Sequence, residues 1–113
     1  MPVYVYQTFE IKQEKFKEAI ENLQEMKKYR NEQYDHTVEV FIPIAGQDYT
    51  YSILATYESL AEMEIQNRKM FDDDNYLKLV GYLFLEHVVQ GTMNTQIYRG
   101  INKKIASKED KAN

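Results

Sequence analysis

Cysteine is absent from this sequence of 113 residues. Disulfide bonds, thiolate nucleophiles and zinc–thiolate sites are therefore excluded, and the redox compartment is left open. No apolar run approaches the roughly 18 residues that a membrane helix needs, and residues 1–9 have neither the basic nor the long apolar region of a secretory leader. We therefore expect no membrane partner and, by default, a cytoplasmic location.

An excess of basic charge is also missing, because the net charge is −4. Proteins that bind the nucleic-acid backbone without sequence preference are usually basic, so we expect no nucleic-acid partner. Hydrophobic residues nevertheless make up 43% of the chain, with ten tyrosines among them. This composition predicts one packed domain over residues 1–101, followed by a loose polar tail over residues 102–113.

Periodicity predicts the order of elements. Residues 3–11 alternate as a strand, with Val3, Val5, Gln7 and Phe9 on one face and Tyr4, Tyr6 and Thr8 on the other. Apolar residues at helical spacing follow over residues 12–33, then strands over 36–45 and 49–57. A helix over 60–71, a second over about 75–86 and a last strand over 88–99, with a bend at Gly91, complete the chain.

This β-α-β-β-α-β order predicts an α+β, ferredoxin-like fold with a four-stranded antiparallel sheet and a split second helix. Its usual strand order, 4-1-3-2, places the second strand at an edge. Pro43 falls within that strand and agrees with an edge position, because proline cannot donate to a sheet ladder.

Three consecutive aspartates, residues 72–74, separate the two parts of the second helix. A calcium-binding EF-hand loop starting at Asp72 would need Gly at its sixth position and Glu at its twelfth, where this chain has Leu77 and Leu83. We therefore expect no metal site here. Asp73 or Asp74 is instead predicted to cap the following helix. Ser59 is predicted to cap the helix before it, with Glu62 completing a capping box.

The sheet face away from the helices also carries aromatic residues. Tyr4 and Tyr6 lie on it, and Tyr49, Tyr51 and Tyr57 share one face of the neighbouring strand. A second copy of the chain, a stacked nucleic acid or another protein could cover such a face. The stretch "GQDYTYSI" lacks the basic residue and second glycine of an RNA-recognition motif. Self-association is therefore favoured, with Tyr4, Tyr6, Tyr49 and Tyr51 packing between copies.

The stretch "YVYQTFEIKQEKFKEAI" resembles the first strand and helix of the dimeric α+β barrel superfamily. "LATYESLAEMEIQNRKMFDDDNYLKLV" is similar to the third strand, Ser-capped helix and Asp-led break of its NIPSNAP-like members, and "VVQGTMNTQIYRGI" to their closing strand. The superfamily includes antibiotic-biosynthesis-type monooxygenases, haem-degrading monooxygenases and muconolactone isomerase-like enzymes. The resemblance implies a homodimer formed through the sheet faces, with a small-molecule pocket between sheet and helices.

This sequence departs from those relatives in several places. Gln7 stands where NIPSNAP-like members have Arg, and Tyr57 where they often have Trp. No histidine lies on the face of the last helix where haem-degrading members carry their haem ligand. We therefore expect no cofactor.

The candidate site residues follow from position and chemistry. Gln7 interrupts an apolar strand face, and a buried amide requires a hydrogen-bonding partner, so it could orient a substrate or be a purely structural amide. His87 is a candidate general acid or base, or a helix C-terminal charge. Four aromatic residues are candidates for substrate binding or simply for the core: Phe9, Tyr57, Phe71 and Tyr76. His36 precedes a strand in a polar stretch and is a weaker candidate.

Two functions fit these observations. The first is a small-molecule enzyme, a monooxygenase or isomerase that uses no cofactor and acts on an aromatic or otherwise apolar substrate. The second is a homodimeric, non-catalytic protein that binds a ligand or takes part in a stress response.

Overall fold

The computed structural model describes residues 1–46 and 50–101. In chain order these form β1 (Val3–Glu10), a short 3-10 helix η1 (Gln13–Lys15), α1 (Phe16–Gln33), β2 (Thr37–Phe41), β3 (Thr50–Tyr57), α2 (Leu60–Phe71), α3 (Asp74–Glu86) and β4 (Asn94–Arg99). The predicted α+β order with a split second helix is therefore confirmed. The predicted polar tail and Tyr49 lie outside the described residues.

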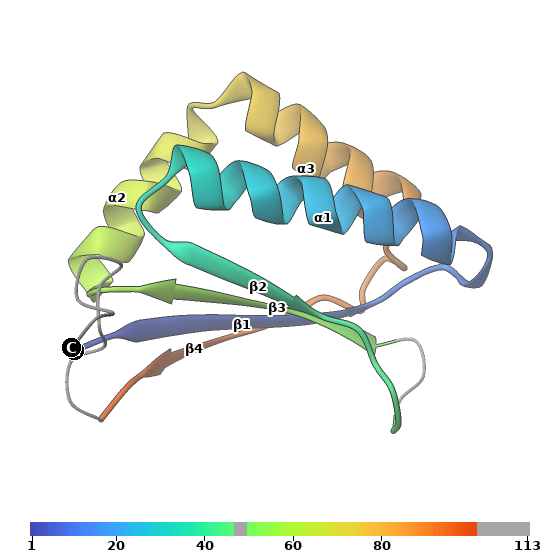
Figure 1. Ribbon diagram of the computed structural model, residues 1–113, viewed down its shortest axis with the longest axis horizontal. Helices are drawn as coiled ribbons and strands as arrows, with labels where there is room; N and C mark the ends of the chain where they lie inside the picture. Colours follow the sequence, from blue (N-terminus) through green and yellow to red (C-terminus); the bar gives the residue numbers. More distant parts are fainter. Residues whose placement is uncertain (47–49, 102–113) are drawn as a thin grey trace.

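The four strands form one antiparallel sheet in the order β2-β3-β1-β4, which is the predicted ferredoxin-like order. All three α-helices cover the same face of this sheet, and the opposite face carries no helix in the described part of the chain (Figure 1). The alternation of side chains along each strand therefore separates a helix-covered face from an open face.

The two edge strands are shorter than the sequence predicts. β2 lies at an edge as predicted, but its pairing ends with Phe41 opposite Ser52, so Pro43 lies beyond the strand and not within it. β4 begins at Asn94, because Gly91 has a φ of 84° and the chain turns there. Glycine accepts this left-handed conformation without the penalty that a Cβ atom would bring.

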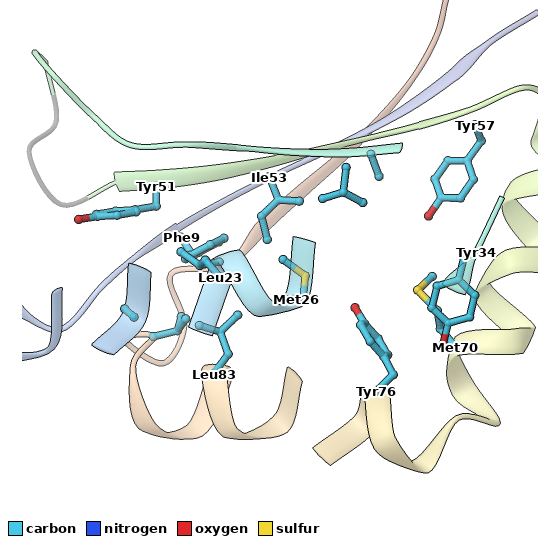
Figure 2. Close-up of a cluster of buried hydrophobic side chains, with 14 of the residues drawn as sticks. Phe9, Leu23, Met26, Tyr34, Tyr51, Ile53, Tyr57, Met70, Tyr76 and Leu83 are labelled. Carbon is cyan, nitrogen blue, oxygen red and sulfur yellow. The ribbon is translucent and has the colours of Figure 1, made fainter. Parts of the chain in front are cut away.

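Figure 2 shows the core between the sheet and the helices. It contains Phe9 and Ile53 from β1 and β3, which face Leu23 and Met26 of α1 and Leu83 of α3. Each of these side chains is at most 1% exposed. Full burial of such a side chain contributes roughly 1.5–3 kcal/mol, so this layer holds the helices on the sheet.

Tyr51 and Tyr57 of β3 lie on the helix-covered face of the sheet. The sequence predicted the open face for Tyr51. The antiparallel register places Tyr51 opposite Phe9 and Tyr57 opposite Val3, and residues directly opposite in a sheet share a face. Both tyrosines are consequently buried under the helices, and the ring of Tyr51 stacks on that of Phe16. The prediction that Tyr51 packs between copies of the chain is therefore wrong.

Side chains at the two helix starts confirm the predicted caps. The Ser59 side chain accepts a hydrogen bond from the Glu62 amide at the start of α2. The Asp73 side chain accepts one from the Tyr76 amide at the start of α3. Each bond satisfies an amide that has no partner within its own helix. The second half of the predicted capping box does not form, because the Glu62 carboxylate accepts from Gln66 Nε2 instead.

Candidate functional site

A cavity of about 400 Å³ lies between the helix-covered face of the sheet and the three helices. Its volume falls within the range of roughly 300–1,000 Å³ that is typical of small-molecule sites. Apolar side chains make up most of its wall, and a few polar groups interrupt them. The lining residues are Val5, Gln7, Met26, Arg30, Ile53, Tyr57, Met63, Asn67, Met70, Phe71, Tyr76, Leu77, Val80, Phe84, Thr95 and Ile97.

Gln7 reaches this cavity from β1, on the face that the sequence predicted. Its side-chain Nε2 donates a hydrogen bond of 3.2 Å to Thr95 Oγ1 of β4, directly opposite in the sheet. The amide oxygen of Gln7 forms no hydrogen bond with the described residues, so it is available as an acceptor. Thr95 was not among the predicted site residues, because strand register cannot be read from an isolated strand sequence.

Arg30 is the charged residue that lines the cavity, and it was not among the predicted site residues. Its side chain is only 6% exposed near the end of α1. Nε donates to His36 Nε2 at 3.0 Å, Nη2 donates to the Tyr57 hydroxyl oxygen at 3.0 Å, and Nη1 lies 4.0 Å from Met26 Sδ. The sequence did contain a signal for the position of Arg30. It follows the core residue Met26 by one helical turn, so it lies on the side of α1 that faces the core.

His36 belongs to the same buried group, although its sequence context is polar. It is 2% exposed, and its ring stacks on that of Tyr57 with the centroids 4.5 Å apart. Because Nε2 accepts from Arg30, this nitrogen must carry a lone pair and the imidazole ring must be neutral. His36 therefore fixes the guanidinium of Arg30 without adding a second positive charge.

The hydroxyl groups of Tyr57 and Tyr76 face each other across the space beside Met26 (Figure 2). Burial raises the pKa of Tyr57, and the charge and hydrogen bond of Arg30 oppose this only in part. Burial also raises the pKa of Tyr76, whose ring centroid lies 6.0 Å from the Arg30 guanidinium carbon. Both hydroxyls are therefore protonated at neutral pH and can donate hydrogen bonds.

Asp73 positions the part of the wall that Tyr76 provides. Its Oδ2 accepts hydrogen bonds of 2.6 Å from the hydroxyls of both Tyr29 and Tyr34, while Oδ1 accepts from the Tyr76 amide. The two tyrosine hydrogen bonds lower the pKa of Asp73. The aspartate predicted as a helix cap therefore also ties α1 and the chain after it to the start of α3.

The structure brings four of the six predicted site residues to this cavity: Gln7, Tyr57, Phe71 and Tyr76. Phe71 is 77% exposed at the rim, whereas the other three lie further inside. Phe9 is a core residue whose ring makes an edge contact with Phe84, one of the lining residues. It does not itself line the cavity.

His87 lies apart from the cavity, immediately after α3. It is 2% exposed, and burial lowers its pKa. Its Nδ1 has no hydrogen-bond partner among the described residues. Its ring packs edge-on against Tyr82. The structure therefore does not join His87 to the other candidates, and a catalytic role for it stays a prediction.

The described residues contain no group of three or more histidine, aspartate or glutamate side chains arranged to hold a metal ion. In the same part of the chain, no helix combines the length and the apolar composition needed to cross a membrane.

Comparison with solved structures places this architecture among the ferredoxin-like α+β folds of monooxygenase-like and NIPSNAP-like proteins. A NIPSNAP-like domain protein from Burkholderia xenovorans superposes with a TM-score of 0.76 at 10% identity, covering 94% of this chain and 90% of its own. A protein from Nitrosomonas europaea, whose name proposes an antibiotic biosynthesis monooxygenase, superposes with a TM-score of 0.72 at 9% identity. The match covers 91% of this chain and 93% of that protein.

A third protein, from Shewanella loihica, has a name that proposes a monooxygenase. It gives a TM-score of 0.61 at 20% identity and covers 89% of this chain and 95% of its own. No model of a protein family and no curated protein matches the sequence. The fold that the sequence resemblance implied is thus confirmed.

Proposed function

We propose that this protein is a small-molecule enzyme of the oxygenase or isomerase type that acts on an aromatic or otherwise apolar substrate. The observation that carries the proposal is the cavity itself, in which an apolar wall surrounds a small set of converging polar groups. The names of two structures with this fold, from Nitrosomonas europaea and Shewanella loihica, support a monooxygenase reaction, with dioxygen as co-substrate.

The cavity residues suggest separate roles. The free amide oxygen of Gln7, held in place by the bond to Thr95, would accept a hydrogen bond from a substrate hydroxyl or amide and so fix the substrate's orientation. The Tyr76 hydroxyl would donate to a substrate oxygen on which negative charge develops. The rings of Phe71 and Tyr76 would contact the apolar body of the substrate.

We also propose that two copies of the chain pair through their open sheet faces. Tyr4, Tyr6 and Leu54 are half-buried on this face, and Tyr98 at its edge is 50% exposed. A second sheet laid on this one would remove these apolar surfaces from water, as sheet-on-sheet packing does in other proteins. A cytoplasmic location, expected from the sequence, stays a prediction.

Native mass spectrometry followed by a turnover assay tests the proposal. Freshly purified protein should show a mass of two chains and a retained small molecule, which accurate mass would identify. That compound and its close analogues would then be assayed for oxygen uptake and for isomerisation. Gln7→Ala should lower kcat/KM by about tenfold or more, as expected for the loss of one buried hydrogen bond. Gln24→Ala, on the exposed side of α1, is the matched control.

Two outcomes would contradict parts of this proposal. Binding without turnover would leave a ligand-binding protein and remove the enzyme assignment. Equal kcat/KM for Gln7→Ala and the control would remove the orienting role of Gln7.

A further inference from the structure

We propose that the natural ligand carries a carboxylate group, which Arg30 and Tyr57 bind at the inner end of the cavity. This inference rests on the proposed function, because it assumes that the cavity binds a small molecule, and it adds the chemical class of that molecule. It depends on the charge balance around Arg30 and not on the likeness to other folds.

The guanidinium of Arg30 is buried without a counter-ion in the described part of the chain. Its hydrogen-bond partners are a histidine nitrogen, a tyrosine hydroxyl and a methionine sulfur, and the ring of Tyr76 lies beside it; all of these groups are neutral. It forms no ion pair with any described carboxylate. A buried charge is costly unless an opposite charge or several strong hydrogen bonds compensate it. The site therefore has an unbalanced positive charge that an anionic ligand would compensate.

Asp73 does not supply the missing negative charge. It is the carboxylate at the break between α2 and α3, and both of its oxygens already accept hydrogen bonds. Tyr29 and Tyr34 bond one oxygen and the Tyr76 amide bonds the other. These three donors direct the carboxylate of Asp73 away from a pairing with Arg30.

Donors at the inner end of the cavity suit a carboxylate. A guanidinium has five N–H donors, and Arg30 uses three of them in the contacts described above. The oxygen of Tyr57 accepts from Arg30 Nη2, so the hydroxyl proton of Tyr57 is left to donate elsewhere. Arg30 and Tyr57 both line the cavity and lie 3.0 Å apart, close enough for the two oxygens of one carboxylate to bond one donor each.

The rest of the wall determines the remainder of the ligand. Beyond the polar end, most of the lining side chains are apolar, among them Val5, Ile53, Met63, Met70, Val80 and Phe84, and the polar exceptions are Gln7, Asn67 and Thr95. Such a wall favours an aromatic or aliphatic body over a sugar or a peptide. The ligand class is therefore an apolar carboxylic acid, sized for a cavity of about 400 Å³.

Matched pairs of small molecules test this inference directly. 2-Naphthoate and its uncharged amide, 2-naphthamide, have almost the same shape, as do octanoate and octanamide. Isothermal titration calorimetry at pH 7.5 would measure the affinity of the wild-type protein for all four. We expect each carboxylate to bind about 10- to 100-fold more tightly than its amide, the range expected for a hydrogen bond to a charged group.

Substitutions in the cavity test whether Arg30 causes the preference for carboxylates over amides. Arg30→Met should abolish the preference for the carboxylate, chiefly by weakening carboxylate binding, and circular dichroism would verify that it folds. Arg68→Met, on the exposed side of α2 and outside the cavity wall, should keep the wild-type preference. Tyr57→Phe should reduce the preference several-fold, which keeps the test available if Arg30→Met does not fold.

Each remaining outcome has a distinct meaning. If the wild-type protein binds carboxylates and amides equally, the cavity remains a binding site and the role of Arg30 is refuted. A preference that survives in Arg30→Met also refutes it. If none of the four compounds binds, the cavity is not a binding site for apolar molecules, and the proposed function falls together with this inference.

Discussion

The hydroxyl of Tyr34 donates a hydrogen bond of 2.6 Å to the carboxylate of Asp73, which lies 39 residues further along the chain. Tyr29 donates to the same oxygen at the same distance. One carboxylate thus connects α1 and the residue after it to the break between α2 and α3. The wall of the cavity on this side therefore depends on a charged group that titrates.

Acid should weaken this connection. The pKa of Asp73 is lowered from its ordinary value of 3.8, chiefly by the hydrogen bonds from Tyr29 and Tyr34. A lowered pKa in the folded state means that the carboxylate contributes stability above pH 3.8, and that this contribution is lost as the pH falls through the folded-state pKa. Urea unfolding measured between pH 7 and pH 2 should show this loss of stability.

Asp73→Asn is the matching variant for the acid limb, because asparagine still caps a helix but carries no charge. It should lower Tm by several degrees at pH 7 and flatten the acid limb of the stability profile. Asp74→Asn, one residue further on and exposed, serves as the control. Identical acid limbs in the two variants would show that Asp73 is not responsible.

Tyr57→Phe should destabilise the folded protein. The hydroxyl of Tyr57 accepts from Arg30 Nη2, and its removal leaves a buried donor on a charged group without that partner. A loss of about 1–3 kcal/mol in the free energy of unfolding is expected. Tyr98→Phe removes a hydroxyl from a half-exposed tyrosine of β4 and should cost less than about 0.5 kcal/mol. Urea denaturation of both variants tests the difference.

His87 should make folding sensitive to pH below neutrality. Burial lowers its pKa from 6.5, so the neutral ring is favoured in the folded protein. Its stabilising contribution is complete above pH 6.5 and is lost as the pH falls through the lower folded-state pKa, because the unfolded chain then binds a proton more readily. An NMR titration that follows a ring proton of His87 should give a pKa below 6.5. A titration at or above 6.5 would contradict this assignment.

Leu54→Lys should separate the proposed dimer. Leu54 lies on the open face of the central strand β3, between Tyr6 of β1 and Glu39 of β2. A lysine there remains solvated in a single copy but would be buried between two sheets, where an unpaired charge is costly. Sedimentation equilibrium should report one chain for this variant and two for the wild type. Ile65→Lys, exposed on α2, should stay at two chains.

The sequence predicted the elements well wherever local patterns determine them. Helix α2 begins and ends where the cap at Ser59 and the apolar spacing indicated, and Asp73 caps α3 as expected. The sheet order followed from the sequence of elements alone. Strand ends were less accurate, because the extent of β2 and β4 depends on pairing with a neighbour, which the residues of one strand do not encode.

The site was predictable only in part, for a similar reason. Gln7 was identifiable because it interrupts an apolar strand face. Arg30 was not predicted and His36 was only a weaker candidate, because charged and polar residues in polar stretches usually face water. They are buried together because both contact Tyr57 of β3, Arg30 through its hydroxyl and His36 through its ring. The face of Tyr51 depended on the register between β1 and β3, which no pattern within β3 reveals.

On strand β1, the side chain of Gln7 faces the cavity, whereas those of its neighbours Tyr6 and Thr8 lie on the open face of the sheet. A substitution at Val5 or Gln7 therefore changes the wall of the cavity, while one at Tyr6 or Thr8 changes the open face. Deleting one residue from β1 would turn the side chains beyond the deletion to the opposite face of the sheet. An insertion or deletion within β1 would therefore disrupt both faces together, whereas a single substitution changes one face and leaves the other intact.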